Sequence, residues 1–273
     1  MRKQLRIWLF VLLTTLLTST SLLAEGVITM TTSKAIGEEI LLGILAKGDI
    51  AIDGALETGE MNEDGFKFYT IKSQTITIRG DVTSLNCGDS ELTSLNLSQN
   101  TVLTSLECSY NQLTSLEVSK NTALEVLDCF SNQLTSLDVS KNTALEVLNC
   151  FSNQLTSLEV SKNTALTRLN CDYNQLTSLD VSKNTALETL YCNYNKLTDL
   201  NISGCARLVD LYCFSNSING KAMTKLVNSL PNRRGKSSGT IVIVDSSSKK
   251  SDKNRCSAAD VTTAKKKNWE VRQ

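Results

Sequence analysis

The sequence predicts a β-rich solenoid of about seven 21-residue coils with parallel strands, and a cap at each end. Two observations support this prediction. The first is a repeat whose units keep one frame and start at Val82, Leu103, Leu124, Leu145, Leu166, Leu187 and Leu208. The second is the loss of this period in residues 25–81 and 218–273, since an open stack of coils needs covered ends.

Each unit reads L-x-x-L-x-C-x-x-N-x-L, which is the leucine-rich-repeat pattern. In the third unit it falls on Leu124, Leu127, Cys129, Asn132 and Leu134. The L-x-C triplet alternates apolar and polar residues, as a half-buried strand does. The second half-unit repeats the rule as L-x-x-L-x-V-x-x-N, so we expect two short extended segments per coil and little helix. The solenoid is assigned to residues 82–217.

An asparagine follows the first segment of nearly every unit. Its side chain can bond backbone groups in the turn, and repetition in register predicts a ladder. The positions are Asn111, Asn132, Asn153, Asn174, Asn195 and Asn216. Ser90 takes this place in the first unit, as expected for a boundary coil.

One cysteine per unit occupies the same inward position; these are Cys87, Cys108, Cys129, Cys150, Cys171, Cys192 and Cys213. Neighbours in such a column lie about 4.8 Å apart with parallel side chains, whereas a disulfide needs Cβ atoms about 3.8 Å apart. We therefore expect free, buried thiols that pack as small hydrophobic groups. A straight column also cannot enclose a tetrahedral zinc ion. Pairing of the two remaining cysteines, Cys205 and Cys256, is left open.

Residues 1–24 are predicted to be a signal peptide. Arg2, Lys3 and Arg6 precede an apolar run that several Thr and Ser residues dilute, which is typical of a secretory signal. The alternative is an uncleaved anchor. We expect a secreted or cell-surface protein with no stable membrane span after cleavage.

Residues 25–81 predict a β-rich N-terminal cap, with a turn at Lys47-Gly48 and a last strand, Thr75–Arg79, that leads into the first coil. Residues 218–273 predict a basic α/β cap. The segment "KAMTKLVNSLP" has one apolar helical stripe and ends at Pro231, "GTIVIVD" reads as a strand, and "SAADVTTAKKK" reads as a helix with Ser257 as its N-cap.

Charge divides unevenly along the chain. Residues 221–273 hold 13 Lys and Arg against 4 Asp and Glu, and residues 1–220 hold 15 against 24. A basic patch of this kind can bind anionic partners, but a solvated cap with surface lysines is the simpler interpretation.

Catalysis is not expected. The chain has no histidine, no glycine-rich phosphate loop and no motif with a nucleophile, so we predict no catalytic residues, cofactor, metal ion or nucleic-acid partner. A column of acidic residues in the second half-units offers a calcium alternative; it consists of Glu117, Asp138, Glu159 and Asp180. The lysines three residues later provide a simpler counter-charge.

The outward positions of the first segment differ from unit to unit, whereas the second half-unit is nearly constant. A surface that varies along its length can encode a particular partner, and aromatic side chains favour protein or glycan recognition. The candidate ligand-binding residues are Tyr110, Glu125, Asp128, Phe130, Phe151, Arg168, Tyr173, Tyr191, Tyr194, Tyr212 and Phe214. Tyr191 and Tyr212 hold the central outward position. The other six aromatics lie one or two places before the Asn, so the alternative for them is that each ring covers its neighbour's turn.

The repeat "LTSLDVSKNTALEVLDC" resembles bacterial internalin-type leucine-rich-repeat proteins, in particular the secreted subtype with 21-residue, Cys-containing units. Together with the tail "AMTKLVNSLP…TTAKKKNW" it is similar to surface and secreted repeat proteins of anaerobic Gram-negative bacteria. The resemblance implies a non-enzymatic extracellular module, adaptor- or adhesin-like, that binds a protein of a host or neighbouring cell. The alternatives are a structural spacer of the cell surface and a glycan-binding protein. The chain departs from the family in its β-rich N-terminal cap and in having no LPxTG sorting motif.

Overall fold

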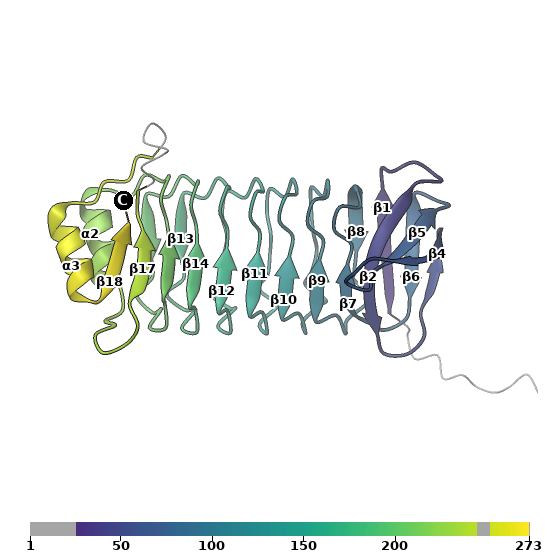
Figure 1. Ribbon diagram of the computed structural model, residues 1–273, viewed down its shortest axis with the longest axis horizontal. Helices are drawn as coiled ribbons and strands as arrows, with labels where there is room; N and C mark the ends of the chain where they lie inside the picture. The colour runs from purple at the N-terminus through teal and green to yellow at the C-terminus, as the bar shows by residue number, and fades with distance from the viewer. Residues whose placement is uncertain (1–25, 245–251, 273) are drawn as a thin grey trace, which may run out of the picture.

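The computed structural model describes residues 26–244 and 252–272, and the predicted signal peptide lies outside them. The described chain is an elongated solenoid with a β-rich cap at the N-terminal end and two helices at the C-terminal end (Figure 1). Within the described residues, no helix is long and apolar enough to cross a bilayer.

Seven parallel strands, 21 residues apart, form one side of the solenoid. They are β7 (Val82–Asn86), β9 (Ser105–Glu107), β10 (Val126–Asp128), β11 (Val147–Asn149), β12 (Arg168–Asn170), β14 (Thr189–Tyr191) and β16 (Asp210–Tyr212). The strands pair in register, so Leu106, Leu127 and Leu148 lie side by side. This confirms the predicted fold class.

The second half of each coil is less regular than the sequence predicts. Strands form there only in β8 (Leu92–Asn96), β13 (Ser178–Asp180) and β15 (Asp199–Asn201), with one isolated bridge between Asn96 and Glu117. The expectation of two extended segments in every coil is therefore wrong for the other coils, although their inward residues are buried as expected.

The core is a set of rows that run the length of the solenoid. Each coil contributes the same inward side chains, and those of the third coil, Leu124, Leu127, Cys129, Leu134 and Val139, have no exposed surface. Because a coil can bury these residues only against its neighbours, the stack shares one continuous interior.

The asparagine ladder ties each coil to the coil before it, which goes beyond the turn-internal bonding that we predict. Asn153 donates from Nδ2 to the carbonyls of Cys150 at 3.2 Å and Phe151 at 3.3 Å in its own coil, and to that of Cys129 in the preceding coil at 3.0 Å. Its Oδ1 accepts from the amide of Leu134 at 3.0 Å. One buried side chain thus satisfies four backbone groups that water cannot reach.

The N-terminal cap continues both sides of the first coil. It consists of β1 (Val27–Thr32), β2 (Glu39–Ala46), β3 (Ala51–Asp53), β4 (Ala55–Met61), β5 (Lys67–Ile71) and β6 (Thr75–Arg79). β1 pairs with β8 and β2 pairs with β7, both antiparallel. β6 spans Thr75–Arg79, as predicted, and is followed along the chain by β7 of the first coil, whereas in the sheet β1 lies between β6 and β8. The two hydrogen-bonding edges of the coil are covered by strands from the start of the cap.

The C-terminal cap contains α2 (Gly220–Ser229), β17 (Gly239–Val242), α3 (Ala258–Lys266) and β18 (Trp269–Arg272). β17 and β18 extend the parallel sheet beyond β16, and Ile243 follows β17 where the column cysteine would stand. Asn254 then takes the role of the ladder asparagine, although the period is lost. It donates to the carbonyls of Cys213 and Ile243 and accepts from the amide of Ile218, each at 2.8 Å.

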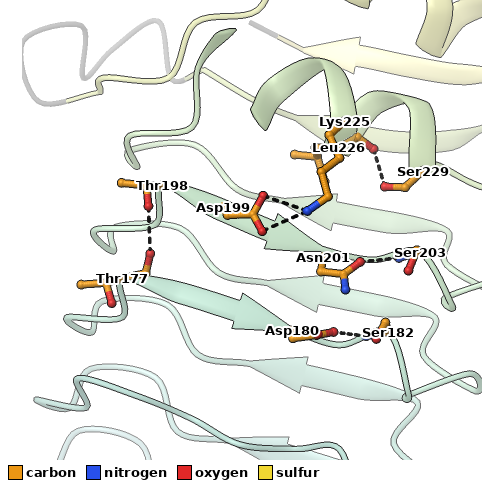
Figure 2. A network of polar contacts seen from close by, with 10 residues as sticks. All are labelled: Thr177, Asp180, Ser182, Thr198, Asp199, Asn201, Ser203, Lys225, Leu226 and Ser229. Atoms are coloured by element: carbon orange, nitrogen blue, oxygen red, sulfur yellow. Dashed lines mark hydrogen bonds and ion pairs between the residues drawn. The ribbon is translucent and has the colours of Figure 1, made fainter. Parts of the chain in front are cut away.

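α2 is fixed to the second-half side of the solenoid. Figure 2 shows the Lys225 Nζ of α2 next to the Asp199 carboxylate of β15, at 3.2 Å from Oδ2. Met223, Leu226 and Val227 are buried, as the apolar stripe predicts. Part of the basic charge of this cap is structural, since Lys267 Nζ donates to the carbonyl of Leu230 at 2.8 Å beyond the end of α2.

The ladder gives a direct test of what holds the coils together. Asn153→Ala is expected to lower the free energy of unfolding by about 3 kcal/mol, because it leaves the buried amide of Leu134 without a partner and removes one of the two hydrogen bonds that each of three carbonyls accepts. Gln154→Ala, at the exposed neighbouring position, is the control and is expected to cost less than about 0.5 kcal/mol. Urea unfolding followed by circular dichroism measures both, and equal losses would contradict the role assigned to the ladder.

Candidate functional site

The parallel sheet turns two rows of side chains outward, and we call this surface the strand face. One row holds Ser84, Ser105, Val126, Val147, Arg168, Thr189 and Asp210. The other holds Asn86, Glu107, Asp128, Asn149, Asn170, Tyr191 and Tyr212. The second row changes from acidic residues near the N-terminal end to tyrosines near the C-terminal end, and the first changes from serine and valine to arginine, threonine and aspartate. Four of the predicted site residues, Asp128, Arg168, Tyr191 and Tyr212, lie here, and Glu125 is exposed just before β10.

Two acidic side chains are neighbours in the second row. Burial raises the pKa of the Glu107 carboxyl, and the nearby charge of Asp128 raises it further. Burial also raises the pKa of Asp128, while a hydrogen bond from Asn149 Nδ2, 3.0 Å long, lowers it. Neither carboxylate belongs to an ion pair among the described residues. This end of the strand face therefore carries negative charge that the chain itself does not neutralise.

Tyr191 and Tyr212 form a tilted pair with ring centroids 4.8 Å apart and planes at 33°. Both rings are half-buried. The pKa of Tyr191 is raised, first by burial and then by Tyr212 and Asp210, while the charge of Arg168 acts in the opposite direction. The structure thus brings together two rings, one cation and one carboxylate at the C-terminal end of the strand face.

Tyr191 lacks a side-chain hydrogen bond that the equivalent residues of other coils make. In the same row, Asp128, Asn149 and Asn170 each accept from the backbone amide two residues later, at 3.1–3.3 Å. A tyrosine cannot do this, and the corresponding amide, that of Asn193, is accepted instead by Asp172 of the preceding coil at 2.5 Å. The side-chain Nδ2 of Asn193 donates to the same carboxylate at 3.0 Å.

This substitute contact is costly. Asp172 is only 8% exposed, and burial raises the pKa of its carboxyl to about 7. The Oδ1 of Asn193, also buried, has no hydrogen-bond partner among the described residues. Local packing therefore does not explain why a tyrosine stands at position 191. The sequence gives no signal for this buried pair, because neither residue belongs to the repeat pattern.

The six remaining aromatic candidates form one continuous row along the turns, which we call the ring row. Successive centroids lie 4.1–6.0 Å apart, and the row runs through Tyr110, Phe130, Phe151, Tyr173, Tyr194 and Phe214. Most contacts are edge-to-face, so each ring packs on its neighbour, although Tyr110 stays 59% and Tyr173 47% exposed. The tyrosines occupy the left-handed position before the Asn, with φ near 50°, and the phenylalanines precede it. Rings from both positions, one or two residues before the Asn, join the same row. Their mutual contacts favour a packing role over a binding role.

The seven column cysteines are free and fully buried. Several thiols donate to a carbonyl of the next coil, for example Cys171 Sγ to Tyr191 at 3.4 Å. Burial raises the pKa of Cys87 to about 12, so the reactive thiolate is suppressed. Cys205 and Cys256 do not form a disulfide with each other. Cys205 replaces a second-half asparagine, and its Sγ donates to the carbonyl of Val181 at 3.2 Å just as Asn184 Nδ2 does to that of Val160 at 2.9 Å.

The acidic column of the second half has a structural role in addition to the predicted counter-charge of the lysines, whose charge helps to lower the pKa of Glu117, Asp138 and Asp180. Glu117, Asp138, Glu159 and Asp180 each accept from the amide of the serine two residues later, at 2.7–2.8 Å. This bond is the first cause of the lowered pKa of Glu117. None of the ion pairs among the described residues joins this column to a lysine. No cluster of metal-ligating side chains occurs in the described part of the chain.

No protein-family model matches the chain, and no curated protein matches its sequence. Several solved structures are similar to it. The functional domain of the internalin InlJ of Listeria monocytogenes, described as including a cysteine ladder, is 30% identical over 72% of this chain and 50% of that one, with a TM-score of 0.48. Internalin InlF of the same organism is 20% identical over 64% and 49%, with a TM-score of 0.54. A leucine-rich-repeat protein of Leptospira interrogans is 22% identical over 66% and 46%, with a TM-score of 0.54.

The fold is a leucine-rich-repeat solenoid. The two likenesses with a TM-score of 0.54, together with the 21-residue spacing of the strands, establish it. The chain spans about half the length of the structures that it matches. At the identities of these two structures the likeness concerns the solenoid alone.

The cysteine column predicts a simple labelling result. In the folded protein, a thiol reagent at pH 7 is expected to modify at most one cysteine, the half-buried Cys256, because the other eight are buried. All nine are expected to react after unfolding in guanidinium chloride. Mass spectrometry of the labelled protein counts the adducts. Rapid modification of several column thiols under native conditions would contradict the shared interior.

The buried Asp172 predicts a pH-dependent contribution to stability. Because its pKa is about 7 in the folded protein and ordinarily 3.8, folding favours the protonated form. Its contribution is therefore fully present below about pH 4 and is lost as the pH rises toward 7 and above. The asparagine of the Asp172→Asn variant cannot ionise. The free energy of unfolding of this variant, relative to that of the wild type, is therefore expected to be about 1–2 kcal/mol higher at pH 8 than at pH 5. Urea unfolding at the two pH values measures this difference, and a difference that does not change with pH would contradict it.

Proposed function

We propose that the protein is a non-enzymatic recognition module that acts outside the cytoplasm and binds a protein partner through the strand face. The observation that carries this proposal is Tyr191. Its position lacks the local hydrogen bond made by Asp128, Asn149 and Asn170, and the substitute is a buried carboxylate with a raised pKa. A tyrosine that removes a local hydrogen bond and requires a buried carboxylate in its place is better explained by a contact with a partner than by packing.

The pair of tyrosines supplies the anchor of the proposed interface. Tyr and Arg contribute strongly at the centre of protein interfaces, and here Tyr191 and Tyr212 lie beside Arg168. The acidic residues toward the other end of the strand face, Glu107 and Asp128, favour a partner with a basic region.

The extracellular location rests on the N-terminal sequence. Arg2, Lys3 and Arg6 before a Ser- and Thr-diluted apolar run are typical of a secretory signal. The column thiols are compatible with export because they are fully buried, which protects them from oxidation.

A structural spacer is the second candidate, and the ring row favours it. Six rings that cover one another, together with a second half-unit that repeats the same turn bond, form a stiff and uniform rod. The spacer role predicts that substitutions at the tyrosine pair change stability at most, without changing any association.

The two candidates are separated by Tyr191→Asn combined with Tyr212→Asn. Asparagine is the residue that Asn149 and Asn170 provide in the same row, so the variant regains the local hydrogen bond and is expected to be at least as stable as the wild type. We expect partner affinity to fall at least about tenfold, which corresponds to about 1.4 kcal/mol.

The partner is captured by a photo-crosslinking residue placed at Asn170 on the strand face, in extracts of the native surroundings of the protein. The control places it at the exposed Thr156 in the second half of a coil. Recognition through the strand face predicts a crosslinked protein from position 170 alone, lost in the double variant while thermal unfolding is unchanged. Equal crosslinking from both positions, or no effect of the double variant, would overturn the proposal.

A further inference from the structure

A cavity of about 270 Å³ lies at the N-terminal end of the strand face, and we call it the hairpin cavity. Its floor is formed by β2, β7 and β9, and its wall is the loop between β4 and β5. β2 pairs with β7 so that Leu45 lies opposite Ser84 and Gly43 opposite Asn86. The strand face therefore continues onto β2, and the loop stands at its end.

The sequence of the loop fixes this wall. Asn62 Oδ1 accepts from the amides of Asp64 at 3.1 Å and Phe66 at 2.8 Å, and Gly65 adopts φ of 82°. The Phe66 ring then lies against Gly43, where a Cβ atom would be 2.7 Å from two ring carbons. Only glycine at position 43 lets the ring lie this close to β2.

The lining combines apolar surface with negative charge. Leu45 is 67% exposed, and Phe66 completes the apolar side, while the side chain of Ile44 packs against the core. Asp64 and Glu107 supply carboxylates, and no lysine or arginine lines the cavity. Burial and then the nearby charge of Asp128 raise the pKa of Glu107, while hydrogen bonds from Asn86 and Ser109 lower it. Among the described residues, neither carboxylate takes part in an ion pair.

We propose that the hairpin cavity binds an arginine side chain of the protein partner. The aliphatic part packs on Leu45, the guanidinium stacks against Phe66, and its N–H groups donate to the Glu107 carboxylate, with Asp64 adding charge from the loop. Arginine fits better than lysine because its planar group can stack on a ring and bond a carboxylate through two donors at once.

This inference rests on the proposed function and adds a second contact point to the same face. Tyr191 lies four strands beyond Glu107, so the two points are about 19 Å apart at a strand spacing of about 4.8 Å. An extended segment of about six residues covers this distance. The chemistry of the strand face thus fits an extended peptide segment with arginine at one end and a group that packs on tyrosine at the other.

The test uses N-acetyl-arginine amide as the probe and the protein labelled with ¹³C at Ile and Leu methyl groups. Saturable shifts are expected at the methyl groups of Leu45, which is exposed in the cavity. N-acetyl-citrulline amide, which has nearly the same shape without the charge, is expected to bind at least about tenfold more weakly. Glu107→Gln is expected to weaken arginine binding about tenfold, whereas Glu159→Gln, in the second half of a coil, leaves it unchanged.

Each result decides the inference separately from the proposed function. Equal shifts with citrulline, shifts that do not map to the cavity, or binding that is unaffected by Glu107→Gln would overturn the arginine site. The tyrosine double variant is expected to leave arginine-amide binding unchanged, because the pair lies about 19 Å away. If the small probe fails while crosslinking from Asn170 still depends on the tyrosines, the arginine site is wrong and strand-face recognition stands.

Discussion

The structure depends on one requirement, that every flat coil satisfies its buried backbone groups through its neighbour. A coil of 21 residues without helix has few internal hydrogen bonds, and its two turns bring carbonyls and amides into a dry interior. The ladder asparagine of the first half meets this requirement. Each Nδ2 reaches carbonyls of its own coil and of the preceding one, and each Oδ1 accepts an amide of the preceding coil. The same side chain thus closes the turn and fixes the stacking.

Stacking of this kind leaves unpaired backbone at both ends, and the two caps solve the problem differently. At the N-terminal end, β1 and β2 pair antiparallel with the two sides of the first coil, so both edges are covered at once. At the C-terminal end the ladder itself is extended. Asn254 completes one more turn after Ile243. The ammonium group of Lys267 donates hydrogen bonds to carbonyls at the end of α2. The caps are therefore continuations of the coil's hydrogen bonding, and the hairpin cavity arises where one of them meets the strand face.

The repeat could be predicted from sequence because every unit places the same residue types at the same inward positions. Leu127, Cys129 and Asn132 recur at fixed spacing, and burial of every copy follows from stacking. The caps could not be predicted in detail, because each contact there occurs once. Nothing in the sequence links Asn254 to Cys213, 41 residues earlier, or Phe66 to Gly43. The buried Asp172 could not be predicted for the same reason. It accepts the amide of Asn193 in the next coil only because Tyr191 there lacks the usual acceptor.

The two halves of a coil close their turns in different ways, and this explains why one side varies and the other does not. In the second half an outward acidic side chain accepts the serine amide two residues later, at 2.7–2.8 Å, while the buried asparagine Oδ1 has no hydrogen-bond partner among the described residues. Substituting alanine at Asp138 or Glu159 would therefore remove this turn bond, whereas glutamine at position 159 keeps an acceptor oxygen.

In the first half the buried asparagine uses both its donor and its acceptor, so the outward residue contributes only a longer bond of 3.1–3.3 Å. That residue can be exchanged for tyrosine when a neighbouring coil supplies another acceptor, as Asp172 does for Asn193. Because the inner ladder closes the turn, the outer row is free to carry the chemistry of recognition. The freedom of the strand face is thus a consequence of how the interior is bonded, and it is the structural basis of the recognition that we propose for that face.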